Sequence, residues 1–397
     1  MSILSSRIER MAESETIAMS QRSRDLKAQG HDVINLSLGE PDFNTPDIIK
    51  EAGIQAIKDN YSHYTPVPGL VELREAIVEK LRRDNQLSYT PDQIVVSTGA
   101  KQSLMNVVLC LIDPGDKVVV AAPYWVSYEA MVNFADGEMI TVNAGVEQNF
   151  KITPQQLDDA LTEDTKLFMF SSPSNPTGGA YSEDELRALA EVFKRYPNTY
   201  IISDEIYEHI RFEGKHFSLA QIPELYDRVI VVNGVSKSFA MTGWRIGYIA
   251  ANKTIAKACT KMQGQFTSGA SGISQMASRA AMYVLEEDLS DMVNAFSKRR
   301  EIMIEGLSNI PGFVCNRPEG AFYLFPKVSE LFGKRFNDQV IENATDLCMY
   351  LINEAHVATV PGSAFGADNY IRLSYAASEE ELKTALDRIR KAIEQLQ

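Results

Sequence analysis

Five short apolar runs are the feature that most constrains how this chain can fold. They cover residues 93–96, 117–121, 166–170, 199–203 and 228–232. Helical patterns separate them, and in one of these Leu104, Val107, Val108 and Leu111 form an apolar stripe. Near-continuous apolar strands that alternate with helices are typical of a parallel sheet whose two faces are both covered. Residues from about 45 to 250 are therefore predicted to form an α/β unit.

The pattern changes in the last third of the chain. A long helical stretch spans about 275–307, strand-like segments follow at 321–325 and 370–375, and a helix is expected over 380–396. This predicts a smaller α+β unit. We expect residues 45–290 to form a large domain and 291–397 a small C-terminal domain, with 1–44 as an N-terminal arm that also contributes to the small domain.

Composition restricts the possible partners. The 397 residues contain 39 basic and 53 acidic side chains, a net charge of −14, so a nucleic-acid backbone would be repelled. No apolar run approaches the roughly 20 residues of a membrane helix, and no apolar signal region follows the first residues. We therefore expect no membrane or nucleic-acid partner and a cytoplasmic location. The four cysteines and five histidines lack metal-ligand spacing, so no metal is expected.

Lys237 follows the run at 228–232, and Arg245 comes shortly after it. This places an amine and a permanent cation at the end of a predicted sheet strand, where α/β proteins bind ligands. Such a lysine can form a Schiff base with an aldehyde cofactor. A single lysine is more often a solvated loop residue, so the interpretation depends on its neighbours.

Two other strand ends contain polar residues that strand propensity does not explain. Gly99 and the start of the next helix would let backbone N–H groups approach a phosphate, although Thr98 could simply cap that helix. Asn175 lies between two prolines in a stiffened loop, although it could only form an Asx turn. Each signal is weak when taken alone.

Asp204 ends the run at 199–203, and Tyr207 follows it. A carboxylate at the end of a buried strand is costly unless it meets a cation. A helix cap or a structural ion pair would also explain it, and strand alternation does not exclude Glu205 in its place. Together, the lysine, carboxylate, amide, phenol, arginine and phosphate cradle are the groups that pyridoxal 5′-phosphate needs.

Seven motifs along the chain carry a family resemblance. They cover residues 39–42, 64–69, 123–128, 175–178, 204–207, 236–237 and 372–374. In this order they resemble the class I and II aminotransferases that depend on pyridoxal phosphate, and more closely the bacterial aspartate aminotransferases of the thermophile-like subgroup. The resemblance implies the three-layer fold type I, with a mainly parallel central sheet and a smaller α+β domain.

The resemblance also implies a role for each motif residue. Lys237 looks like the Schiff-base lysine, Asp204 like the partner of the ring nitrogen, and Tyr207 and Asn175 like partners of the 3-oxygen. Arg372, with Asn175 and the backbone of Gly39, would hold the substrate α-carboxylate. The remaining cofactor contacts implied in this way are Gly99, Ala100, Lys101, Ser236 and Arg245 near the phosphate, Trp125 on the ring, and Tyr64 reaching the phosphate of a neighbouring subunit in a homodimer with shared active sites.

The resemblance implies amino-acid and 2-oxo-acid substrates. Lys101 matches a lysine near the distal carboxylate of the substrate, and Trp125 also borders it, which favours transfer between L-aspartate and 2-oxoglutarate by a ping-pong mechanism. Some relatives accept prephenate and have an N-terminal lysine before a proline. Residues 11–16 here are Met-Ala-Glu-Ser-Glu-Thr, which lack that lysine. Prephenate, aromatic amino acids or alanine remain alternative substrates, and a cofactor-binding regulatory protein without turnover is a remote one.

Overall fold

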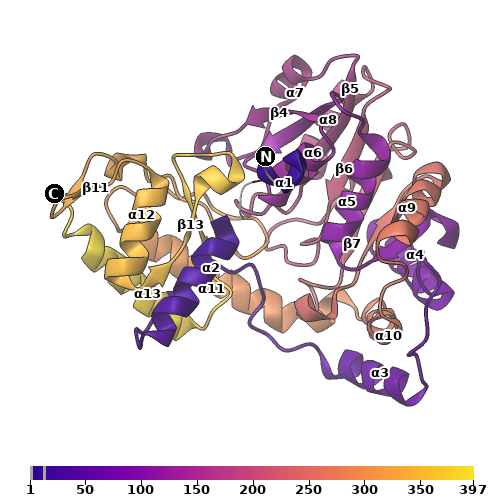
Figure 1. The fold of residues 1–397 in the computed structure, drawn as a ribbon, viewed down its shortest axis with the longest axis horizontal. Helices are drawn as coiled ribbons and strands as arrows, with labels where there is room; N and C mark the ends of the chain where they lie inside the picture. Colours follow the sequence, from indigo (N-terminus) through magenta and orange to yellow (C-terminus); the bar gives the residue numbers. More distant parts are fainter. Residues whose placement is uncertain (1–2, 12–14) are drawn as a thin grey trace.

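The computed structural model describes residues 3–11 and 15–397. It contains two units side by side, one built on a seven-stranded sheet and the other on the C-terminal third of the chain (Figure 1). Within the described residues, no helix has the length and apolar character that crossing a membrane requires.

The large sheet has the order β2-β8-β7-β6-β5-β3-β4, and β8 is antiparallel to both of its neighbours. The other pairs are parallel, so the predicted mainly parallel sheet is confirmed. Sequence reasoning did not find the edge strand β4, which is half-exposed, or β8, which is only four residues long. The strands are β2 Ile94–Ser97, β3 Lys117–Ala122, β4 Glu138–Asn143, β5 Thr165–Ser171, β6 Tyr200–Asp204, β7 Val229–Gly234 and β8 Gly247–Ala250.

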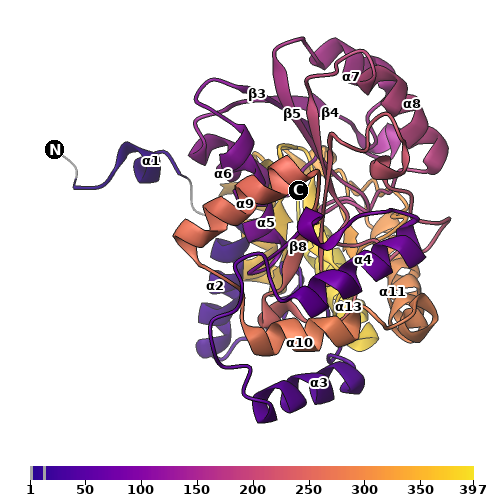
Figure 2. The ribbon, with the colours of Figure 1, turned by 90° about the vertical axis from the view of Figure 1, so that its right-hand side faces the viewer.

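Helices cover both faces of this sheet, and each face has its own apolar cluster. The predicted stripe on α5 is confirmed, because Leu104, Val107 and Val108 are fully buried against one face. α3 and α10 lie side by side at the edge of the unit (Figure 2). The helices are α3 Asp47–Lys58, α4 Val71–Asn85, α5 Ala100–Leu111, α6 Ser127–Phe134, α7 Pro154–Ala160, α8 Glu183–Phe193, α9 Lys253–Phe266 and α10 Gly272–Ala281.

The second unit combines both ends of the chain. β1 (Ile34–Asn35) pairs with β12 (Val357–Ala358), and a short sheet joins β13 (Val360–Pro361), β14 (Ile371–Ser374) and β9 (Tyr323–Leu324). The smallest sheet pairs β10 (Arg335–Phe336) with β11 (Gln339–Val340). The helices are α2 Glu15–Ala28, α11 Ser290–Ser308, α12 Ala344–Tyr350 and α13 Glu379–Ile393. The short α1 (Ser6–Glu9) projects from the rest of the molecule (Figure 2), and its Arg7 and the adjacent Arg10 contact Phe134 and Asp136 of the large unit.

The prediction of one continuous helix over 275–307 is wrong. The structure has two helices there, α10 and α11, separated by a 3-10 turn at Glu286–Leu289. The backbone N–H of Leu285 donates to the carboxylate of Asp288, which starts the turn. The local acidic side chain therefore competes with the continuous helix that composition favours.

A buried ion pair joins α4 to the segment after β6. Lys80 is 3% exposed and pairs with Glu208, which also accepts hydrogen bonds from Asn85 and Asn233, both at 2.7 Å. Burial raises the pKa of Glu208, but Lys80 and His209 more than offset this, and the net shift is downward.

We predict that Lys80→Met will lower the free energy of unfolding by about 3–5 kcal/mol, because it leaves the buried Glu208 carboxylate without its cation. Urea unfolding of the cofactor-loaded protein measures this. Lys253→Met is the matched control, because the partners in the Lys253–Asp92 pair are 66% and 57% exposed. It should leave the free energy of unfolding almost unchanged. Equal effects of the two variants would contradict the prediction.

Candidate functional site

A cavity of about 280 Å³ lies at the carboxyl ends of the large-sheet strands. Such strand ends are where α/β proteins place their ligands. Residues from both units line it, so the site depends on how the two units pack. The lining residues are Thr16, Ile17, Gly39, Ala100, Lys101, Trp125, Val126, Ser127, Ser171, Asn175, Asp204, Ile206, Tyr207, Ser236, Lys237, Thr242, Arg245, Tyr323 and Arg372.

Lys237 follows β7 and projects into this cavity, where its Nζ donates a hydrogen bond to the backbone oxygen of Gly39. Burial lowers the pKa of Lys237 to about 8, although Glu40 acts in the opposite direction. A lysine that loses its proton near pH 8 is a far better nucleophile and base at neutral pH than an ordinary lysine.

Asp204 ends β6 and is 4% exposed. Burial raises its pKa to about 6, and the Tyr128 hydroxyl, which donates to Oδ2 at 2.8 Å, opposes that rise. Glu205 is instead bound to Ser203, Ser218 and His216, and it does not line the cavity. Of the two carboxylates between which strand alternation does not choose, only Asp204 lines the cavity.

The start of α5 and Arg245 form a positively charged end of the cavity. Gly99 has φ +84°, and a Cβ built there would lie 2.3 Å from Arg245 Nη2, so any larger residue would collide with the guanidinium. Gly99 occupies the cap position without a side-chain capping bond, so Thr98 is not the helix cap. Ala100 and Lys101 begin the helix at this point, and Ser236 lines the same cavity. Free helix N–H groups next to a cation suit a phosphate.

Arg372 on β14 is 2% exposed. Its Nη1 donates to Asn175 Oδ1 at 2.9 Å and its Nη2 to the Ser37 carbonyl at 2.6 Å, while Nε is buried without a partner. Burial lowers the pKa of Arg372, and no carboxylate among residues 3–11 and 15–397 pairs with it. A buried guanidinium without an acid partner is energetically costly, so this site favours an anionic ligand.

Tyr323 was not found by sequence reasoning. Its hydroxyl lies 2.9 Å from that of Tyr207, its ring packs 4.7 Å from the Arg372 guanidinium, and a Cβ on Gly39 would come within 2.5 Å of its oxygen. The residue belongs to the apolar run 321–325, which looks like an ordinary core strand. Thr16, Ile17, Ser127 and Ser171 also line the cavity and were not predicted as site residues, because nothing in the sequence distinguishes these side chains from their neighbours.

Of the remaining predicted residues, Lys101 and Trp125 line the cavity and Tyr64 does not. Lys101 lies 5.0 Å from the Trp125 ring centroid, and burial together with Arg245 lowers the pKa of Lys101. Tyr64 is fully exposed and does not line this cavity, so one copy of the chain does not bring it to the other site residues. In the stretch 11–16 discussed for prephenate, residues 12–14 lie outside the described residues.

Comparison with known proteins identifies the family. Residues 31–389 match the family described as aminotransferase class I and II. The chain belongs to this family. A probable aspartate/prephenate aminotransferase of Rickettsia felis is 46% identical, over 99% of this chain and 97% of that protein. A bifunctional aspartate aminotransferase and glutamate/aspartate-prephenate aminotransferase of Petunia hybrida is 47% identical, over 98% and 82%.

Solved structures of aspartate aminotransferases have the same fold. The enzyme from Rhizobium meliloti superposes with a TM-score of 0.96 at 42% identity, with complete coverage of both chains. The Thermus thermophilus enzyme with maleate gives a TM-score of 0.92 at 39% identity, over 99% of this chain and all of that one. The predicted fold type I and the resemblance to aminotransferases are confirmed.

Class I and II aminotransferases depend on pyridoxal 5′-phosphate. The cavity fits this cofactor on its own geometry. It offers the Lys237 amine for the aldehyde, the buried Asp204 carboxylate for a cationic ring nitrogen, and a positively charged cradle at Gly99 and Arg245 for the phosphate.

We predict that uptake of pyridoxal phosphate by cofactor-free protein will accelerate about tenfold per pH unit below pH 8 and level off above it, because only the uncharged Lys237 amine reacts and its pKa is about 8. The growth of visible absorbance after mixing measures this rate. A simple alkylamine in the same buffers is the control for the pH response of the cofactor itself. A rate that still rises steeply beyond pH 10 would show that the lysine is not perturbed.

Proposed function

We propose that this aminotransferase transfers the amino group of L-aspartate to 2-oxoglutarate, which gives oxaloacetate and L-glutamate. Four cations without ion-pair partners among the described residues line the cavity, and if Lys237 and Arg245 serve the cofactor, Arg372 and Lys101 remain for the substrate, which is the observation that supports this most directly. Two cations match the two carboxylates of a dicarboxylic substrate. Several relatives with 45–47% identity are named aspartate or aspartate/prephenate aminotransferases.

In this proposal Arg372 binds the substrate α-carboxylate. The planar guanidinium can hold a carboxylate with two parallel hydrogen bonds. Asn175 Oδ1 and the Ser37 carbonyl fix two of its nitrogens, and stacking against Tyr323 and Phe365, at 4.7 and 4.9 Å, fixes its plane. The backbone of Gly39, opposite Tyr323, would border the same carboxylate.

Lys237 would act as the proton carrier. When bound, pyridoxal phosphate supplies a carbonyl that captures the amino group and a ring that accepts electrons from Cα. Nζ of Lys237 would take the proton from substrate Cα and release it to the cofactor carbon rather than back to Cα, for which a pKa of about 8 is suitable near neutral pH. Asp204 would hold a protonated ring nitrogen, because this buried carboxylate has hydrogen-bond donors but no ion-pair partner among the described residues. Tyr207 and Asn175 would donate hydrogen bonds to the 3-oxygen of the ring.

Lys101 would select substrates with a distal carboxylate. It lies beside Trp125 at the start of α5, and its ammonium group has no ion-pair partner among the described residues. A second candidate function is amino transfer to prephenate, which also has two carboxylates and which the names of the Rickettsia felis and Petunia hybrida relatives include.

We also propose that the chain acts as a homodimer. Ile54 and Ile57 on α3, Phe266 on α9 and Tyr64 are 42%, 60%, 63% and 101% exposed. Large apolar side chains grouped at one edge are typical of an interface. A second copy covering this edge would let Tyr64 reach the neighbouring phosphate. Within each copy, we propose that residues 45–290 form the large domain, and residues 291–397 with the arm 1–44 form the small one.

A comparison of amino acids tests the substrate. Cofactor-loaded protein is mixed with each amino acid, and the loss of visible absorbance gives a limiting rate and an apparent Kd. We expect aspartate and glutamate to give the highest ratio of rate to Kd. Lys101→Met should lower that ratio for aspartate about tenfold or more, and change it little for alanine, because only the dicarboxylate loses a charge-assisted contact.

Lys237→Ala is the control for this experiment and should give no amino transfer. A wild-type preference for alanine or phenylalanine would reject aspartate as the substrate. Prephenate is tested separately, by converting the protein to its amine form with glutamate and then adding prephenate or 2-oxoglutarate. A faster return of absorbance with prephenate would favour the second candidate.

A further inference from the structure

The loop that contains Asn175 is held from outside by a segment of the second unit, residues 316–321. The backbone N–H groups of Glu319 and Gly320 both donate to the Gly178 carbonyl, at 2.8 and 2.9 Å. Asn316 Nδ2 donates to the Thr177 carbonyl at 3.1 Å. The outer side of the Asn175 loop is thus bound to the second unit by its backbone.

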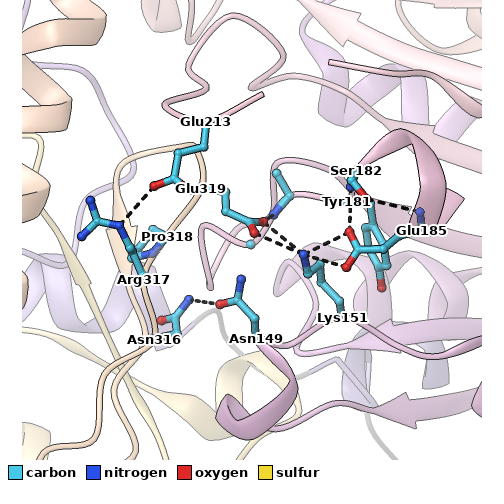
Figure 3. Close-up of polar contacts among 12 residues, drawn as sticks. Asn149, Lys151, Tyr181, Ser182, Glu185, Glu213, Asn316, Arg317, Pro318 and Glu319 are labelled. Carbon is cyan, nitrogen blue, oxygen red and sulfur yellow. Dashed lines mark hydrogen bonds and ion pairs between the residues drawn. The ribbon is translucent and has the colours of Figure 1, made fainter. Parts of the chain in front are cut away.

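Lys151 fixes this contact by joining two carboxylates from different parts of the fold. Its Nζ lies 2.9 Å from Glu185 on α8 and 3.2 Å from Glu319 in the 316–321 segment (Figure 3). The side chains of Lys151 and Glu319 are 15% and 22% exposed, so water screens their pair less than the pair with Glu185, whose side chain is 41% exposed. The other oxygen of Glu319 accepts the Ala180 N–H at 2.8 Å. The triad of Lys151, Glu185 and Glu319 therefore spans the loop and both units.

The fit between the loop and the segment is close. Gly178 has φ +68°, and a Cβ there would lie 2.5 Å from Pro318 Cβ and 2.8 Å from the Gly320 carbonyl. A shift of the segment would therefore displace the loop as well. On its inner side the same loop presents Asn175, whose Oδ1 accepts the hydrogen bond from Arg372 Nη1 at 2.9 Å.

We propose that Glu319 and Lys151 are positioning residues for substrate binding. They hold the Asn175 loop in the place where Asn175 orients the Arg372 guanidinium towards the substrate carboxylate. This inference rests on the proposed role of Arg372. Neither residue lines the cavity, so neither would touch cofactor or substrate. Two other cations lie nearby: Arg211 binds the Tyr181 and Glu213 carbonyls and Arg317 pairs with Glu213, so neither can replace Lys151 without moving.

Two variants of Glu319 separate the effect of its charge from that of its hydrogen-bond acceptor. Glu319→Ala removes the charge and the acceptor for Ala180 N–H, and leaves Lys151 with Glu185 alone. Glu319→Gln keeps an oxygen for Ala180 and removes only the charge. A small displacement of a binding group weakens binding more than it changes the chemistry at a distant atom. Both Glu319 variants are therefore expected to raise the Kd for the amino acid.

The test measures the half-reaction of the cofactor-loaded variants with aspartate. We expect Glu319→Ala to raise the apparent Kd about tenfold and Glu319→Gln about threefold, with limiting rates unchanged within about twofold. Lys151→Met combined with Glu319→Ala should be no worse than the more harmful single variant, because the two residues act as a unit. The matched control is Glu183→Gln. Glu183 is on α8, like Glu185, but its pair with Arg187 is exposed, so this variant should bind aspartate normally.

Three results would overturn the inference: an unchanged Kd in Glu319→Ala, a loss confined to the limiting rate, or additive effects of the Lys151 and Glu319 changes. The unfolding midpoint and visible spectrum of each variant check its folding, and Glu319→Gln provides the test if the alanine variant does not fold. If the proposed function is wrong, wild-type protein itself will not respond to aspartate, and this distinguishes that outcome from failure of the inference on Glu319 and Lys151. The comparison then uses the amino acid that wild-type protein converts, because every amino acid has the α-carboxylate.

Discussion

The buried Arg372 guanidinium links the two halves of this aminotransferase. It projects from the small sheet of the second unit, yet its hydrogen-bond acceptors are Asn175, in a loop after the large sheet, and the Ser37 carbonyl, in the N-terminal segment. Three distant parts of the chain must therefore be in place before this cation is solvated by protein. Because no described carboxylate neutralises it, the fold retains a positive charge at the boundary between the units, and an anionic substrate would complete the site.

The cavity differs sharply in charge from the rest of the molecule. The chain has a net charge of −14, whereas Lys101, Lys237, Arg245 and Arg372 all line one small space with Asp204. Burial moves the pKa of Lys237 down to about 8 and that of Asp204 up to about 6, so each group changes charge nearer to neutral pH than a solvated lysine or aspartate, and both are mostly charged at pH 7. The four cations would attract the anionic phosphate of the cofactor. The cationic ring of the cofactor would stabilise the ionised form of Asp204.

Much of this site could be predicted from the sequence, because its polar groups follow apolar runs and parallel strands all end at one edge. Local pattern could not choose between Asp204 and Glu205, since that choice depends on which side of the β6 end faces the cavity. Tyr323 was missed because it belongs to an apolar strand, and its role arises only when that strand packs beside Arg372. The contact of Glu319 with Lys151 joins residues 168 positions apart, and no local pattern encodes such a distance. Tyr64 remains a prediction that depends on a second copy of the chain.

The central claim is that Lys237 is the covalent anchor of pyridoxal phosphate in this cavity. The most direct measurement is borohydride reduction of the cofactor-loaded protein, followed by protease digestion and mass spectrometry of the peptides. Reduction converts the C=N bond between lysine and cofactor into a stable amine, so the modified residue keeps the cofactor's mass. The account predicts that this mass is found on the peptide containing Lys237 and that equimolar cofactor leaves the other lysines unmodified. Stoichiometric labelling of Lys101 or any other lysine, with Lys237 unmodified, would contradict it.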